Sequence, residues 1–323
     1  KDIFFIGDEC HRHGSEKLSG TLPTAFYRMG LSATPFNSDD DEFDSPFPDH
    51  AKERLKSYYG EIVSSYTLAD AINDEVLCEY EYHIVPVYLT VEEQESFEEI
   101  SAEIGRLIAI QKGGVLSEGQ KQKLTIECGK RSRLLGSAED KLNALKKLLT
   151  NFPPTDRKHS LFYCGEGVVE NSSTENSELE IKNINRVSRA LMNSGWSSSR
   201  FTSQENTVIR KKIMNEFVEG SIDALVSLKV LDEGVDVPVC NKAFILASTR
   251  NPRQYVQRRG RVLRKSAGKD RAHIYDFVVL PSLGARSSAS LGLISAELER
   301  VDDFCMLARN KYEVELEIDR LEM

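Results

Sequence analysis

The sequence predicts an α/β fold of two lobes, each built on a parallel sheet, with a helical segment between them and a C-terminal helix. Short apolar runs of strand length recur along the chain and alternate with stretches that carry apolar residues at helical spacing. A stretch rich in Glu, Lys, Ile and Leu interrupts that alternation, and Pro153 and Pro154 follow it. The expected units are the C-terminal part of a first lobe (1–90), a helical bridge (91–150), a second lobe (151–285) and a helical extension (286–323).

The composition is that of a globular protein, with 40% apolar and 29% charged residues among 323. A net charge of −9 excludes a uniformly basic coat, but nine Lys or Arg residues fall between positions 250 and 271 against the single acid Asp270. The positive potential is therefore local. The six cysteines form no C-x-x-C pair, and neither a signal peptide nor a membrane-spanning run is visible. We therefore expect a reducing, cytoplasmic location.

Two adjacent carboxylates follow the first apolar run. Residues 3–6 (IFFI) predict a fully buried strand, and Asp8 and Glu9 come directly after it. In a parallel sheet, ligands collect at the carboxyl ends of the strands. Asp8 is placed to hold Mg²⁺ on ATP, and Glu9 to orient and deprotonate the attacking water. The alternative is a loop with two solvated acids.

Further along the first lobe, residues 27–36 (YRMGLSATPF) predict a second short strand that ends in small hydroxyl residues. Residues 79–89 predict another strand, and His83 within it is expected to be structural. Residues 114–121 (GVLSEGQK) come near a phosphate loop but have GQK where GKS or GKT is required, and no buried strand runs into them. No phosphate-loop sequence occurs in the 323 residues.

The second lobe is expected to carry buried strands at residues 160–164 and 243–246, a strand that starts at 224–227, and a further strand at 273–280. Its arginine-rich stretch, residues 254–264 (QYVQRRGRVLR), holds Arg258, Arg259, Arg261 and Arg264 within seven positions. Helical spacing would place Gln257, Arg261 and Arg264 on one face. Guanidinium groups keep their charge and grip phosphate oxygens with a planar fork, so such a face favours a polyanion. The alternative is a solvated basic helix end.

These stretches together resemble the motifs of superfamily 2 helicases and translocases. Residues 8–11 (DECH) resemble the DExH box, and residues 32–34 (SAT) resemble motif III. Residues 229–238 (KVLDEGVDVP) resemble motif V of the restriction-type and XPB-like branch. The arginine stretch resembles motif VI in the form Q-x-x-G-R-x-x-R. Four motifs in the family's order outweigh the separate alternatives.

The resemblance implies two RecA-like lobes and assigns roles by position. Asp8 and Glu9 would hold Mg²⁺ and activate water, and Arg261 and Arg264 would be arginine fingers that close on the γ-phosphate of ATP. The remaining roles are nucleotide contacts by His11, Gln257, Gly234 and Asp236, coupling by Ser32 and Thr34, and nucleic-acid contacts by Thr202 and Ser227.

The implied activity is that of an ATP-dependent DNA helicase or translocase, with this chain as its motif II to VI portion. DNA would be bound through its backbone, independently of sequence. The family's phosphate loop is expected upstream of Lys1, so residues 1–323 alone should be inactive. Nuclease or modification subunits are possible partners. Two alternatives stay open: a motor subunit of a restriction or phage-defence complex, and a nucleic-acid-binding or assembly module without hydrolysis.

Overall fold

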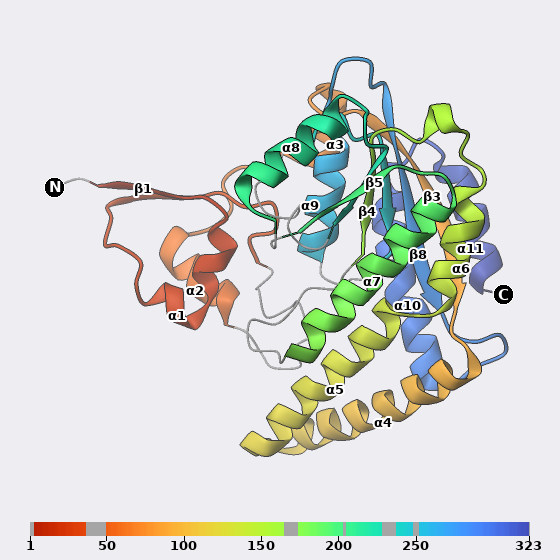
Figure 1. Ribbon diagram of the computed structural model, residues 1–323. Helices are drawn as coiled ribbons and strands as arrows, with labels where there is room; N and C mark the ends of the chain where they lie inside the picture. The colour runs from red at the N-terminus through yellow and green to blue at the C-terminus, as the bar shows by residue number, and fades with distance from the viewer. Residues whose placement is uncertain are drawn as a thin grey trace.

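The computed structural model describes residues 3–36, 50–164, 174–202, 205–227, 237–247 and 252–322. A small N-terminal unit lies beside a larger α/β body (Figure 1). In the described residues, no helix has the length and apolar character needed to cross a membrane. The α/β fold with a parallel sheet, predicted from the sequence, is confirmed.

The small unit is built on two parallel strands, β1 (Phe4–Gly7) and β2 (Tyr27–Gly30), with Gly7 paired to Gly30. The short helices η1 (Cys10–Gly14) and α1 (Glu16–Ser19) follow β1, and α2 (Ala51–Tyr59) packs on η1. The prediction of a fully buried first strand is wrong. Phe4 is 59% exposed, because the described residues do not cover both faces of this two-stranded sheet.

The larger body is organised around six parallel strands in the order β3-β8-β7-β4-β6-β5. Every residue of β4, β6 and β7 is buried, as expected for a parallel sheet with helices on both faces. The strands are β3 (Glu79–Tyr88), β4 (Ser160–Tyr163), β5 (Ser198–Phe201), β6 (Ala224–Ser227), β7 (Lys242–Ile245) and β8 (Arg271–Leu280).

The edge strand β3 belongs to the larger body, so the expected boundary at residue 90 differs from the structure. It pairs with β8 over ten residues, from Glu79 opposite Arg271 to Tyr88 opposite Leu280. The preceding helix α3 (Leu68–Asn73) also packs against the core of the body. A sequence boundary drawn at the start of the helical segment misses this, because the pairing partner is about 190 positions away.

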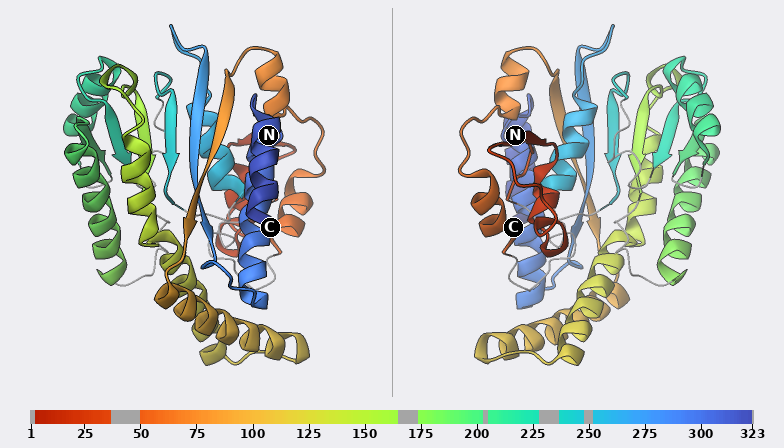
Figure 2. Two further views of the ribbon diagram at one scale, coloured as in Figure 1. Left: turned by 90° about the vertical axis from the view of Figure 1, so that its right-hand side faces the viewer. Right: turned by 90° about the vertical axis from the view of Figure 1, so that its left-hand side faces the viewer.

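Helices cover both faces of the large sheet. One core contains side chains of α8, α9 and α11, and the other contains side chains of α6 and α7. Figure 2 shows α4 and α5 extending away from the sheet as a hairpin. The bounds are α4 (Val91–Gly113), α5 (Glu118–Gly136), α6 (Asp140–Leu149), η3 (Pro154–Asp156), α7 (Thr174–Asn193), α8 (Thr207–Val218), α9 (Pro252–Val262), α10 (Ser288–Cys305) and α11 (Lys311–Glu322).

The hairpin begins at defined caps and has an apolar core of its own. Thr90 and Ser117 each form a capping box at the first turn of α4 and α5, which satisfies otherwise unpaired backbone amides. Between the two helices the buried side chains are Ile104, Leu107, Leu116, Leu124 and Cys128. The segment is therefore helical, as expected, and has a core separate from those of the sheet. The prediction that it bridges two lobes is wrong, because β3 before it and β4 after it belong to the same sheet.

Candidate nucleotide and nucleic-acid site

The ends of β1 and β2 meet at one edge of the small sheet. Beyond the paired glycines the contact continues, since Leu31 donates its N–H to the Gly7 carbonyl and Cys10 donates to the Leu31 carbonyl, both at 2.9 Å. A Cβ at position 7 would collide with the Tyr59 hydroxyl and the His13 ring, so glycine lets these two side chains pack against the end of β1. The edge thus brings residues 8–11 beside residues 32–34.

His11 joins the two segments. Its ring is 3% exposed, and Nδ1 lies 3.0 Å from the Ser32 Oγ and 3.2 Å from the Glu9 Oε2. The Ser32 Oγ also accepts the N–H of Thr34 at 3.2 Å. The DECH and SAT segments are therefore connected through one buried imidazole and one hydroxyl, and a displacement of either segment is felt by the other.

Glu9 has an unusual backbone for a residue with a side chain. Its φ of 48° and ψ of 46° lie in the left-handed region, which costs about 1–3 kcal/mol for a non-glycine residue. Its side chain is 47% exposed, while Oε2 is shielded from solvent and lacks a hydrogen bond of good geometry. A strained turn thus holds this carboxylate at the sheet edge, where it can accept a proton.

Asp8 is exposed at the same edge, and its Oδ1 accepts the N–H of Glu9 at 3.0 Å. One or two carboxylates, completed by phosphates and water, are the set that Mg²⁺ usually takes in proteins. The donor set at this edge fits that ion, which Asp8 would hold and which would supply charge neutralisation at the phosphates.

His13 of η1 and Tyr59 of α2 contact each other next to this sheet edge. The His13 Nδ1 lies 2.5 Å from the Tyr59 hydroxyl. Burial lowers the pKa of His13 and raises the pKa of Tyr59 to about 12. Both groups are therefore neutral near pH 7, and their hydrogen bond packs η1 against α2 without introducing charge.

In the larger body, Thr202 and Ser227 lie side by side at the carboxyl ends of neighbouring strands. Phe201 pairs with Ser227, and Thr202 follows Phe201 directly. Both expected nucleic-acid contacts are buried, and the Thr202 N–H and hydroxyl both donate to the Glu205 carboxylate, at 2.6 and 2.7 Å. Gly234 and Asp236 lie outside the described residues.

The arginine stretch forms α9, and the helix ends earlier than the expected common face requires. Gln257 and Arg261 are half-buried on α9, but Arg264 is exposed beyond its end and forms a β-bridge with Leu77. A single helical face holding all three side chains is therefore wrong. Figures 1 and 2 show α9 on the side of the body toward the small unit.

Two of the four arginines anchor the helix. Arg259 forms an ion pair with Asp303 on α10 at 3.0 Å, and its guanidinium lies 4.9 Å from the centre of the Phe304 ring. Arg258 is 1% exposed and lies over the ring of Tyr163 at 5.1 Å. The sequence could not separate these anchors from Arg261 and Arg264, because Asp303 is 44 positions away.

Lys269 holds the end of α9 and was not singled out from the sequence. Its ammonium donates to the carbonyls of Val262 at 2.5 Å, Arg264 at 2.8 Å and Pro238 at 3.1 Å. A cation at the C-terminus of a helix satisfies the last carbonyls and opposes the helix dipole. Burial lowers the pKa of Lys269. No local pattern marks this role, since it depends on a loop folding back.

The six-stranded parallel sheet with helices on both faces, and with hydroxyl and arginine side chains near the carboxyl ends of its strands, has the fold class of a RecA-like lobe. It is preceded by the two strand ends of the small unit. Two family models match the chain, one described as SWI2/SNF2 ATPase over residues 1–109 and one described as helicase conserved C-terminal domain over residues 157–266. These two matches support a helicase-type fragment of superfamily 2.

Relatives match parts of the chain. Dicer-like protein 2-2 of Aspergillus niger is 27% identical over 124 residues, which are 38% of this chain and 7% of that protein. DNA 3'-5' translocase XPB2 of Sulfurisphaera tokodaii is 41% identical over 56 residues, 17% of this chain and 13% of that protein. The chain thus corresponds to a small share of these relatives' length.

Among solved structures, the ATP-dependent Type ISP restriction-modification enzyme LlaBIII bound to DNA has the same fold over 96% of this chain and 21% of its own. The TM-score is 0.52 and the sequence identity 17%. That likeness is one of fold.

Proposed function

We propose that the chain is the motif II to VI portion of an ATP-dependent DNA helicase or translocase. The observation that carries this proposal is the contact of His11 with Ser32 at 3.0 Å, because it joins the acidic segment to the segment that would sense nucleic acid. A site for hydrolysis alone would not need that link. DNA is proposed as the nucleic acid along which the protein moves, because XPB2 is named a DNA translocase and LlaBIII is bound to DNA.

In this proposal, Glu9 takes the proton of the attacking water and Asp8 holds the metal of the nucleotide. Arg261 and Arg264 approach the γ-phosphate when the two units close. Gln257 and His11 position the nucleotide, as do Gly234 and Asp236. Thr202 and Ser227 contact the sugar-phosphate backbone of the nucleic acid. Because both residues are buried, either the neighbouring side chains move aside or the main-chain groups of the two residues make the contact.

The test of the catalytic assignment is Glu9→Gln in the full-length protein. We expect DNA-stimulated ATP hydrolysis to fall at least about 10²-fold, because the proton acceptor is lost, while ATP-dependent DNA binding is retained. Glu16→Gln, an exposed acid in the same unit, is the matched control and should leave hydrolysis unchanged. If Glu9→Gln hydrolyses ATP like the parent, the chain acts as a binding or assembly module instead.

A second test concerns the phosphate loop. The 323 residues contain no GxxxxGK followed by Ser or Thr, the sequence whose backbone amides and lysine hold the β- and γ-phosphates. We propose that residues 1–323 alone show no DNA-stimulated ATPase and that the full-length protein does. Turnover by the 323-residue protein would contradict this. A nuclease activity in the full-length protein or its partner would assign the motor to a restriction or phage-defence complex.

A further inference from the structure

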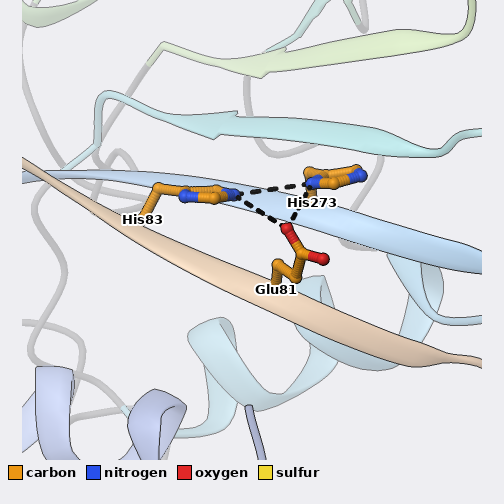
Figure 3. Close-up of side chains that lie close together, drawn as sticks. All are labelled: Glu81, His83 and His273. Carbon is orange, nitrogen blue, oxygen red and sulfur yellow. Dashed lines mark hydrogen bonds and ion pairs between the residues drawn. The ribbon is translucent and has the colours of Figure 1, made fainter. Parts of the chain in front are cut away.

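Two histidines and a glutamate converge near the amino ends of β3 and β8. Glu81 and His273 are paired across the strands, and His83 lies two residues further along β3 on the same face. Figure 3 shows their side chains directed toward one another. Within the described parts of the chain, these three form the one group of metal-ligating side chains whose donor atoms all lie within 4.8 Å of one another.

The spacing of the three donor atoms is that of a metal site. The His83 Nε2 and His273 Nδ1 are 3.4 Å apart, and the Glu81 Oε2 lies 3.9 Å from the first and 3.5 Å from the second. A triangle with these sides has a circumscribed circle of radius about 2.1 Å, so a point in the plane of the three atoms lies about 2.1 Å from each. A tetrahedral ion lies outside that plane, and it requires the 3.9 Å side to shorten by about 0.5 Å. Zinc is bound by imidazole nitrogen at about 2.0–2.1 Å and by carboxylate oxygen at about 2.0–2.2 Å.

The surroundings hold two of the three ligands, Glu81 and His83, in place. The other carboxylate oxygen of Glu81, Oε1, accepts a hydrogen bond from Arg271 at 2.6 Å, which leaves Oε2 directed at the two rings. The His83 ring stacks on Tyr275 with centroids 4.6 Å apart. Outer partners of this kind fix the orientation of metal ligands.

The charges around the trio balance before a cation enters. Glu81 and Arg271 form one ion pair, and the nearby Asp156 and Lys242 form another at 2.8 Å. A neutral imidazole can offer either ring nitrogen to a metal ion. The three side chains are 23–33% exposed, so water can reach the fourth position of a tetrahedral ion.

We propose that the His83 Nε2, the His273 Nδ1 and the Glu81 Oε2 bind a zinc ion whose fourth ligand is water. The ion joins the edge strand β3 to β8, at the end of the sheet opposite Thr202 and Ser227. Its role is to fasten β3, the first strand that the chain contributes to the larger body, before the α4–α5 hairpin begins. This inference is independent of the proposed motor activity.

The test uses the 323-residue protein, freed of metal by a chelator and titrated with Zn²⁺ and Co²⁺. We expect one ion per chain, the visible absorption of tetrahedral Co²⁺, and nitrogen and oxygen ligands at about 2.0–2.2 Å by X-ray absorption at the zinc edge. All six cysteines are buried, so thiolate ligands should be absent from that spectrum. Failure of the parent protein to bind either ion stoichiometrically would overturn the proposal.

Variants locate the ion. His83→Gln and His273→Gln should each lower Zn²⁺ affinity by at least about 10–100-fold, since the loss of even an outer partner costs that much. His50→Gln, an exposed histidine outside the trio, should bind like the parent. Equal affinity of all three variants would overturn the proposal. If a variant misfolds, the test is made on the parent protein alone. Zn²⁺ should raise the Tm of the parent, and chelation should reverse the rise. An unchanged Tm would overturn the proposal.

Discussion

The strand β1 of the small unit and the strand β4 of the larger body have the same length and similar apolar content, but their surroundings are opposite. Phe4 and Ile6 of β1 are more than half exposed, whereas every side chain of β4 is buried and Phe162 stacks on Phe244 at 4.3 Å. The larger body is therefore held by its apolar cores. In the small unit, hydrogen bonds at the strand ends contribute more to holding the segments together. These bonds involve His11 and Ser32, two of the residues proposed to act in the site.

This contrast separates two kinds of substitution. Changes in the body should mainly alter the free energy of unfolding, while changes at the edge of the small unit should mainly alter turnover. Arg261 is the exception that tests the proposed link between the units, because it belongs to the body but would act on a nucleotide held at the small unit.

The largest effect is expected from Arg261→Ala in the full-length protein. Loss of an arginine finger costs about 10³-fold or more in ATP turnover, so hydrolysis should nearly vanish, while binding of single-stranded DNA at low salt is retained. The measurement is DNA-stimulated ATPase with a parallel DNA-binding titration. Lys265→Ala removes an exposed cation nearby and should leave turnover unchanged. Undiminished hydrolysis in Arg261→Ala would disprove the finger assignment.

A matched pair of phenylalanines compares the two units directly. Phe162→Ala should lower the free energy of unfolding by about 3–5 kcal/mol, because it opens a cavity between buried rings. Phe4→Ala, at 59% exposure, should change it by less than about 0.5 kcal/mol. Urea unfolding followed by circular dichroism measures both. Equal losses in the two variants would mean that the small unit is covered in solution.

Ser32→Ala probes the link between the DECH and SAT segments. Removing the hydroxyl deletes its hydrogen bonds with His11 and Thr34. Only the bond with His11 joins the two segments, and it is worth about 1 kcal/mol, so the ratio of DNA-stimulated to basal ATPase should fall roughly fivefold. Ser65→Ala, an exposed serine outside the site, provides the comparison. An unchanged ratio would show that this bond does not couple the two activities.

The smallest effect is a titration. Burial holds the pKa of His13 below its ordinary value of about 6.5. Because the folded state disfavours the imidazolium, the contribution of His13 to stability is fully present above about pH 6.5 and is lost as the pH falls through the lower folded pKa. An NMR titration, with the signal assigned by His13→Gln, measures this value. A pKa at or above 6.5 would contradict the burial of this ring.

Several features of the fold and site were predictable because they follow from local sequence. Short apolar runs mark β4, β6 and β7, which are buried on both faces. Asp8 and Glu9 were expected at the carboxyl end of a parallel strand, and they follow β1, which pairs in parallel with β2. The structure also brings His11 beside Ser32.

The remaining features depend on contacts between distant positions. The sequence did not show that β3 joins the larger sheet or that Asp303 forms an ion pair with Arg259. It also did not show that Lys269 folds back onto the end of α9. His83 was expected to be structural, and nothing local placed His273 beside it, since 190 positions separate them. Such pairings become visible only when the strands are arranged in three dimensions.

Because β3 belongs to the larger sheet, the α4–α5 hairpin is attached to the larger body and not to the small unit. The small unit ends at α2, and residues 60–67 form its covalent connection to α3 and the body, beginning at Gly60 with a φ of 88°. The hairpin of α4 and α5 lies after that connection. With 23 residues, α4 spans about 35 Å, so the hairpin extends far from the sheet to which it is joined through β3. Rotation of the larger body by about 10° would displace the hairpin tip by about 6 Å, the product of that angle and the length of α4.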